Sequence, residues 1–81
     1  MENRRSVRIV YCQPCGYMQK AFDMAKEILT QYGMRYNKRL GVSLEPGDQG
    51  IFDVYVDGKL IFSKNEKGRF PETNEVVDAL R

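Results

Sequence analysis

Apolar and polar residues alternate along residues 7–11, 40–45 and 51–56, and this period of two predicts three strands. Residues 59–63 return after a two-residue turn and predict a fourth strand. The first is β-branched and aromatic and runs directly into Cys12. Pro46-Gly47 should end the second strand. Asp57-Gly58 lies between the last two, which predicts a hairpin with a type I′ turn.

Two other stretches show the three- and four-residue spacing of helices with one buried face. The apolar positions of the first are Met18, Ala21, Phe22, Ala25, Ile28, Leu29 and Tyr32. We expect this helix to end near Gly33, because glycine readily takes the left-handed conformation that closes a helix. The second helix buries Val76, Val77 and Leu80, and Thr73 or Asn74 should cap it.

The order strand, helix, strand, strand, strand, helix predicts an α/β fold of the thioredoxin-like type, β-α-β-β-β-α. The first strand, helix and strand form a βαβ unit, so these two strands should be parallel. We therefore expect a four-stranded mixed sheet with two helices on one face, in a single domain of residues 1–81. The other face would be open. Its expected residues are polar Arg8, Ser43, Asp53 and Tyr55, with Val10 and Ile51 as an apolar patch for a partner or a dimer.

Composition and charge narrow the functional classes. The chain has 81 residues, of which 42% are hydrophobic, and this predicts a globular domain rather than a disordered one. A net charge of +2, with acids and bases interspersed, does not indicate nucleic acid binding, and Arg4, Arg5 and Arg8 are best explained as a solvated N-terminus. The sequence shows neither a secretory leader nor an apolar run of about 18 residues, so we expect a cytoplasmic protein without a membrane span.

The two cysteines, Cys12 and Cys15, form a C-x-x-C pair between the first strand and the first helix. Backbone N–H groups without partners and the helix dipole favour a thiolate at such a junction, and the thiolate is the reactive form of cysteine. Pro14 would suit the first helical turn. A structural disulfide is the weaker interpretation, because the cytosol keeps thiols reduced and this loop is short.

The chain contains no histidine. Cys–His nucleophilic catalysis and mixed Cys/His zinc sites are therefore excluded. A single C-x-x-C supplies only two metal ligands, so a zinc site would need a second chain. No metal or resident cofactor is expected.

Several motifs together resemble the selenoprotein W, or Rdx, family in its cysteine-containing form. They are Val7–Gly16, Pro46-Gly47, Gly50–Val54, Val56–Gly58, Ile61–Lys64 and Gly68–Pro71. The resemblance implies a thioredoxin-like fold and a thiol redox function in contact with protein thiols or glutathione as a co-substrate. It also implies that Cys12 and Cys15 are the redox pair, with Cys15 at the position where animal members carry selenocysteine.

The roles of the two cysteines stay open at this point. By analogy with thioredoxin, Cys12 would attack and Cys15 would resolve, while the family places its most reactive atom at the second position. We favour Cys12 as the attacking thiol, with the Cys12–Cys15 disulfide as the oxidised state. No counterpart of the thioredoxin cis-proline is evident, since Gly50 directly precedes the third strand.

Supporting roles have plain structural alternatives. Gly50 and Phe52 would either flank the sulfurs or serve backbone geometry and packing. Asp53 would tune a thiol only if it pointed inward, and alternation favours an outward carboxylate. Ser63 and Lys64 could bind an anionic thiol, although a solvated strand end is the simpler expectation. Met18, Phe22 and Met24 are expected to fill core or surface space.

The leading functional hypothesis is therefore a thiol-disulfide oxidoreductase that uses Cys12 and Cys15. The alternative is a non-catalytic protein-binding module that uses the open sheet face or a single thiol. In either case we expect a monomer or a weak homodimer.

Overall fold

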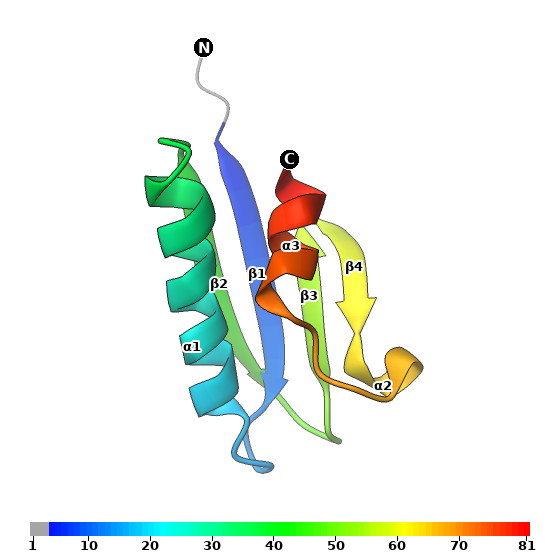
Figure 1. Cartoon of the computed structure of the whole chain (residues 1–81). Helices are drawn as coiled ribbons and strands as arrows, with labels where there is room; N and C mark the ends of the chain where they lie inside the picture. The colour runs from blue at the N-terminus through cyan, green and yellow to red at the C-terminus, as the bar shows by residue number, and fades with distance from the viewer. Residues whose placement is uncertain (1–3) are drawn as a thin grey trace.

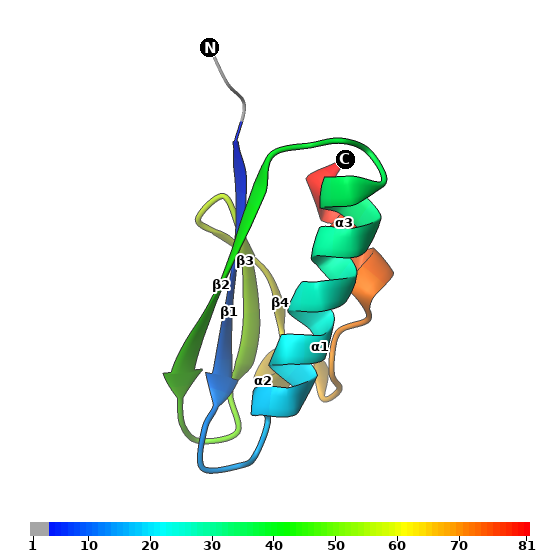
Figure 2. The ribbon, with the colours of Figure 1, turned by 90° about the vertical axis from the view of Figure 1, so that its left-hand side faces the viewer.

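A four-stranded mixed sheet forms one layer of the structure, and helices cover one of its faces (Figures 1 and 2). The computed structural model describes residues 4–81. The strands are β1 (Arg5–Cys12), β2 (Leu40–Gly47), β3 (Phe52–Val56) and β4 (Lys59–Ser63), in the order β2-β1-β3-β4. β1 pairs in parallel with β2 and antiparallel with β3, and β4 pairs antiparallel with β3. The predicted thioredoxin-like α/β fold is confirmed.

The core lies between the sheet and two helices, α1 (Met18–Ile28) and α3 (Thr73–Leu80). Alternate residues of β1 and β3 face the helices, which explains why each strand is buried at every second position. The fully buried residues from these elements include Val7, Ile9, Ala21, Ile28, Val54, Val76 and Leu80.

The first helix does not end at Gly33. After α1 the chain continues as a π-helical segment, η1 (Leu29–Met34), in which the N–H of Arg35 donates to the carbonyl of Thr30. Gly33 lies inside this segment without a positive φ, and Asn37, with φ of 53°, takes the left-handed conformation instead. The predicted C-cap was wrong because the wider turns carry the chain past the glycine before it reverses.

The second strand continues through Pro46 to Gly47, two residues beyond its predicted end. β2 is an edge strand, so only one of its sides needs hydrogen-bond donors. Proline is compatible with an edge strand when its missing N–H lies on the unpaired side. The same proline would disrupt a central strand, and the sequence pattern alone did not distinguish the two positions.

The hairpin between β3 and β4 has the predicted turn. Asp57 and Gly58 both have positive φ, 52° and 85°, as a type I′ turn requires. The Asp57 carboxylate accepts hydrogen bonds from the Ser6 N–H and from Nε of Arg5. These contacts, the Ser6 N–H first, hold the pKa of Asp57 below its usual value and tie the turn to the start of β1.

The connection after β4 contains a short helix that the sequence did not predict, α2 (Lys64–Lys67), which Gly68 ends with φ of 75°. The N-cap of α3 is Glu72, in place of the predicted Thr73 or Asn74. Its backbone N–H donates to Oε1 of Glu75 at 2.8 Å in a capping box. Arg69 donates to both Glu75 oxygens, at 3.0 and 2.8 Å.

The open sheet face carries the residues expected there. The Arg8 guanidinium lies 4.2 Å from the ring centroid of Tyr55 and donates to Glu45 at 3.0 Å. Asp53 lies on this face, between buried Phe52 and Val54 in sequence. Its Oδ1 is covered by neighbouring atoms, and no described residue donates a hydrogen bond to it.

We predict that Glu75→Gln makes the protein less sensitive to acid. The contacts with Arg69 and with the Glu72 N–H lower the pKa of Glu75 from 4.5 to about 2. The folded state therefore holds fewer protons than the unfolded state between these values, so this stabilisation is complete above pH 4.5 and is lost as the pH falls towards 2. Because the pair is partly exposed, the drop in Tm between pH 5 and pH 2 should shrink by only about 3 °C in the variant.

Thermal melts by circular dichroism at several pH values measure this effect. Glutamine retains one oxygen that can accept from the capping N–H, but it removes both the titratable charge and the ion pair with Arg69. Glu66→Gln in α2 is the matched control, because no described residue bonds the Glu66 side chain. Equal pH profiles for Glu75→Gln and the wild type would contradict the prediction.

Candidate functional site

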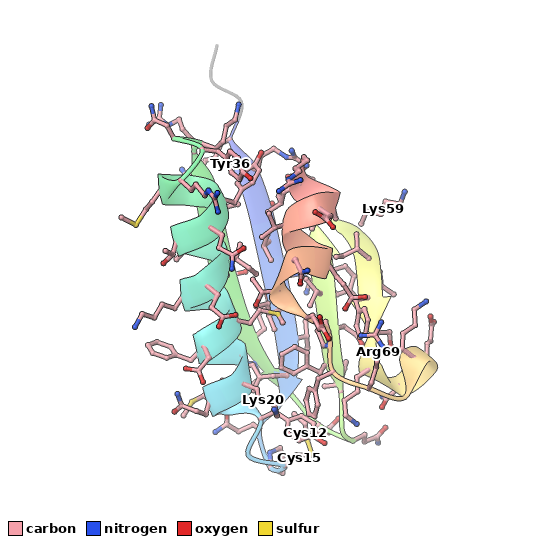
Figure 3. The ribbon with its side chains drawn as sticks, in the orientation of Figure 1. Cys12, Cys15, Lys20, Tyr36, Lys59 and Arg69 are labelled. Carbon is pink, nitrogen blue, oxygen red and sulfur yellow. A yellow bond between two sulfur atoms is a disulfide. The ribbon has the colours of Figure 1, made fainter. Side chains whose placement is uncertain are left out.

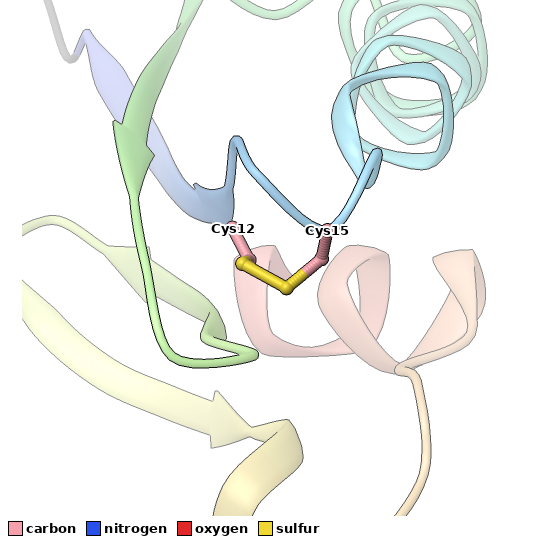
Figure 4. Close-up of a disulfide and its surroundings, with 2 residues drawn as sticks. All are labelled: Cys12 and Cys15. Atoms are coloured by element: carbon pink, nitrogen blue, oxygen red, sulfur yellow. A yellow bond between two sulfur atoms is a disulfide. The ribbon is translucent and has the colours of Figure 1, made fainter.

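Cys12 and Cys15 lie at one end of the molecule, where β1 leads into α1, and they form a disulfide (Figures 3 and 4). Their Cα atoms are 5.3 Å apart. Cys12 is the last residue of β1 and has no exposed surface, whereas Cys15 is exposed. The two sulfurs are therefore in very different environments.

The turn between β1 and α1 is longer than predicted. Gly16 has φ of 80°, which a helix cannot accommodate, and the N–H of Tyr17 donates to the carbonyl of Cys12 at 3.2 Å. α1 begins only at Met18, so Pro14 does not lie in its first turn. Cys15 precedes the helix by three residues. The free N–H groups and the dipole of the first helical turn, which were expected to favour a thiolate, are therefore not next to Cys15.

The loop between β2 and β3 holds the cysteine turn in place from the other side. The N–H of Cys12 donates to the Ile51 carbonyl at 2.8 Å, and the N–H of Gln13 donates to the Gly47 carbonyl at 3.0 Å. A Cβ on Gly47 would lie 2.9 Å from the Ile51 side chain and 3.3 Å from Val10. Val10 and Ile51 therefore both lie beside Gly47, and the missing side chain of this glycine leaves room for them.

Gly50, with φ of 73°, lies in this same loop, next to the cysteine turn. Phe52 is the next residue but one, and it is buried in the core. No described residue follows a cis peptide bond. The position that precedes β3 is therefore built by Gly50 and Ile51 with ordinary trans peptides.

Three rings form an aromatic cluster, Tyr17, Phe52 and Phe70, beside the cysteine turn. The ring centroids of Tyr17 and Phe70 are 4.9 Å apart, and those of Phe52 and Phe70 are 5.3 Å apart, both edge to face. Tyr17 and Phe70 were not predicted as site residues. The proximity of Tyr17 to Cys15 in sequence was a usable signal, but the position of Phe70 depends on the tertiary fold.

Two lysines lie over this aromatic cluster. Nζ of Lys64 is 5.5 Å from the ring centroid of Tyr17 and 5.3 Å from that of Phe70, and Nζ of Lys20 is 4.6 Å from that of Phe70. Figure 3 shows Lys20 near the cysteine end of the molecule. A groove of about 650 Å³ lies between α1 and the segment before α3, and Lys20 and Phe70 are among the residues that line it. Lys64 is therefore not merely a solvated strand end.

Ser63 is buried, with 7% of its surface exposed, so the expectation of a solvated strand end was wrong there as well. It cannot meet a solvent-borne ligand without movement of the chain. Met18, Phe22 and Met24 were expected to fill either core or surface space. Met24 lies in the core, while Met18 and Phe22 are exposed on α1.

Within residues 4–81 no three potential ligands from His, Cys, Asp and Glu come together as a metal site would require. In the same part of the chain, no helix has the length and apolar character needed to cross a bilayer.

Relatives with similar sequences extend over most of the chain. "Migration and invasion enhancer 1" of Bos taurus is 36% identical over 83 residues, which cover 99% of this chain and 67% of that protein. The Mus musculus protein of the same name is 32% identical over 74 residues, which cover 90% of this chain and 59% of that protein. The chain therefore spans less than two thirds of that relative. "Selenoprotein W" of Macaca mulatta is 34% identical over 70 residues, 84% of this chain and 76% of that protein.

Solved structures show the same fold. A selenoprotein W-related protein from Vibrio cholerae superimposes with a TM-score of 0.83 at 25% identity, covering 94% of this chain and 91% of its own. A protein from Bordetella parapertussis gives a TM-score of 0.81 at 28% identity, covering 98% and 96%. The model of the Rdx family matches residues 6–81, which include the cysteine pair. The chain therefore belongs to the Rdx family.

Proposed function

We propose that this protein is a thiol-disulfide oxidoreductase in which Cys15 exchanges with the substrate and Cys12 resolves the mixed disulfide. The observation that carries the proposal is the difference in burial between two sulfurs that are close enough to bond. Membership of the Rdx family supports a thioredoxin-like redox role. The proposed order is the reverse of the one that thioredoxin analogy suggested, because an incoming disulfide can reach Cys15 and not Cys12.

The proposed reaction transfers two electrons. The Cys15 thiolate attacks a substrate disulfide, forms a mixed disulfide and releases one substrate thiolate. The Cys12 thiolate then attacks Sγ of Cys15 and releases the second substrate thiolate, which leaves the Cys12–Cys15 disulfide. A thiol reductant such as glutathione returns the pair to the dithiol by the same steps in reverse.

We predict that Cys12→Ser accumulates a mixed disulfide with glutathione at Cys15, while Cys15→Ser accumulates at least about tenfold less at Cys12, because Cys12 is buried. Intact-mass spectrometry after incubation with oxidised glutathione measures both adducts. In the reduced wild type, alkylation resolved by residue should modify Cys15 faster than Cys12, because Cys12 is buried.

A glutathione redox titration of the wild type completes this test. Reversible formation of the intramolecular disulfide is expected. If Cys12 and Cys15 do not form this disulfide, the redox function is contradicted. If instead the glutathione adduct at Cys12 of Cys15→Ser exceeds the adduct at Cys15 of Cys12→Ser, the redox function stands and the roles of the two cysteines are exchanged.

Glutathione is the proposed co-substrate because it is an anionic thiol and two lysines flank the aromatic cluster beside Cys15. We predict that Lys64→Glu slows reduction of the Cys12–Cys15 disulfide by glutathione at least about threefold, because a cation beside the incoming anionic thiol is replaced by an anion. Reduction by dithiothreitol, which is uncharged, should not change. Lys59→Glu, at the far end of the hairpin, is the control with the same change of charge (Figure 3). Equal effects of the two variants would contradict a local anion-binding role and indicate only long-range electrostatics.

A second candidate function is protein binding through the open sheet face. The observation that favours it is the group of charged and aromatic side chains on this face, where the Arg8 guanidinium lies over the Tyr55 ring and donates to Glu45. Capture experiments with the Cys12→Ser/Cys15→Ser double variant separate the two functions. A partner held by the sheet face stays bound to this variant and is lost from Tyr55→Asp, whereas a redox partner is lost when the cysteines are replaced.

The proposed setting is the cytoplasm, where thiols are kept reduced and a catalytic dithiol can turn over.

A further inference from the structure

β2 forms one edge of the sheet, so only one side of this strand is bonded to β1. Its Gly47 carbonyl accepts from the Gln13 N–H at 3.0 Å, and the carbonyl of Arg39, just before the strand, accepts from the Arg5 N–H at 3.1 Å. In a parallel pair, successive residues of a strand direct their backbone groups alternately to its two sides. The odd-numbered residues from 39 to 47 therefore bond β1, and the even-numbered ones direct their N–H and C=O groups away from the sheet.

Leu40, Val42 and Leu44 are the residues with both outward groups. Pro46 also points outward but has no N–H, so it ends the usable edge. Within residues 4–81, no further strand lies beside β2 in the sheet, and Figure 2 looks toward this side of the molecule. An edge of this kind is a template for pairing with another strand.

The edge is complementary to itself in one register. If a second copy of β2 lies antiparallel with Val42 opposite Val42, then Leu40 lies opposite Leu44 of the other copy. All three outward residues of each copy then meet outward residues, and the three pairs exchange about six backbone hydrogen bonds. A shift by one residue would oppose outward residues with ones that already bond β1.

Charges agree with this register. Arg39 of one copy falls opposite Glu45 of the other, on the open face, where directly opposed side chains of antiparallel strands are close. The pair occurs twice in the symmetric arrangement. Glu45 also accepts from Arg8 of its own chain at 3.0 Å, and a carboxylate can accept both.

α1 and the first residue of η1 add an apolar stripe on the same side, called the α1 stripe below. Met18, Phe22 and Leu29 are 52%, 59% and 38% exposed, and helical spacing places them on one flank. Residues of the opposite flank, such as Lys20 and Glu27, line the groove towards α3. The stripe therefore faces away from α3, towards the free edge of β2, and would meet the same stripe of a second copy.

We propose that this protein forms a weak homodimer through antiparallel pairing of β2 with β2 of a second copy, centred on Val42 and flanked by the α1 stripes. The result is a continuous eight-stranded sheet, since each copy contributes the four strands described above. The partner is a second copy because backbone register, apolar positions and opposed charges are all self-complementary.

Sedimentation equilibrium with protein up to about 1 mM tests this proposal, in the presence of a phosphine reductant that prevents intermolecular disulfides. The wild type should show a monomer–dimer equilibrium. Arg39→Glu and Glu45→Arg should each raise the dimer Kd at least about tenfold, because each puts like charges opposite one another. The double variant should restore the wild-type Kd. Restoration is the decisive result, since Glu45→Arg also removes the ion pair with Arg8.

Leu29→Asp tests the α1 stripe, with Leu60→Asp as its control. The two leucines are 38% and 40% exposed, and Leu60 lies on β4 at the other edge of the sheet. Only Leu29→Asp should weaken the dimer, while circular dichroism shows both variants folded. The proposal would be overturned if the wild type stays monomeric at about 1 mM, or if the double variant does not recover the wild-type Kd. Equal effects of Leu29→Asp and Leu60→Asp on the dimer Kd would also overturn it.

Discussion

The pairing of β1 on both of its sides is the constraint on which the rest of the structure depends. β1 is bonded to β2 along one edge and to β3 along the other, and its alternate residues fill the core beneath α1 and α3. A strand held in this way has no freedom to shift its register, because a slip of one residue would turn its buried side chains to the open face. Its last residue, Cys12, is consequently fixed and buried.

This fixed strand end explains the asymmetry of the cysteine pair. Cys12 belongs to the sheet and bonds the Ile51 carbonyl, whereas Cys15 belongs to a turn that Gly16 bends away from the helix. A rigid, shielded sulfur next to an exposed one suits a reaction in which the outer thiol meets the substrate and the inner thiol closes the disulfide. In this fold the exposed sulfur is the second of the pair.

The two edge strands of the sheet, β2 and β4, differ in length and regularity. β4 is short and irregular, with a register shift opposite Val54 and Tyr55, and such a bulge discourages pairing with another strand. β2 is longer, follows β1 without a shift, and carries only Pro46 as a blunting residue. The long, regular edge is therefore the one at which a second copy could pair.

The sequence by itself determined the order of the four strands and the two longer helices, the Asp57-Gly58 hairpin, the inward residues of the strands and the position of the C-x-x-C pair. These features follow from local periodicity and turn chemistry. Tertiary structure alone decided which cysteine is exposed, because burial depends on what packs around a residue. It also placed Phe70 and Lys64 beside Tyr17, carried the first helix past Gly33 and let β2 run through Pro46. Each of these outcomes depends on contacts between segments far apart in the chain, which no local pattern of apolar and polar residues encodes.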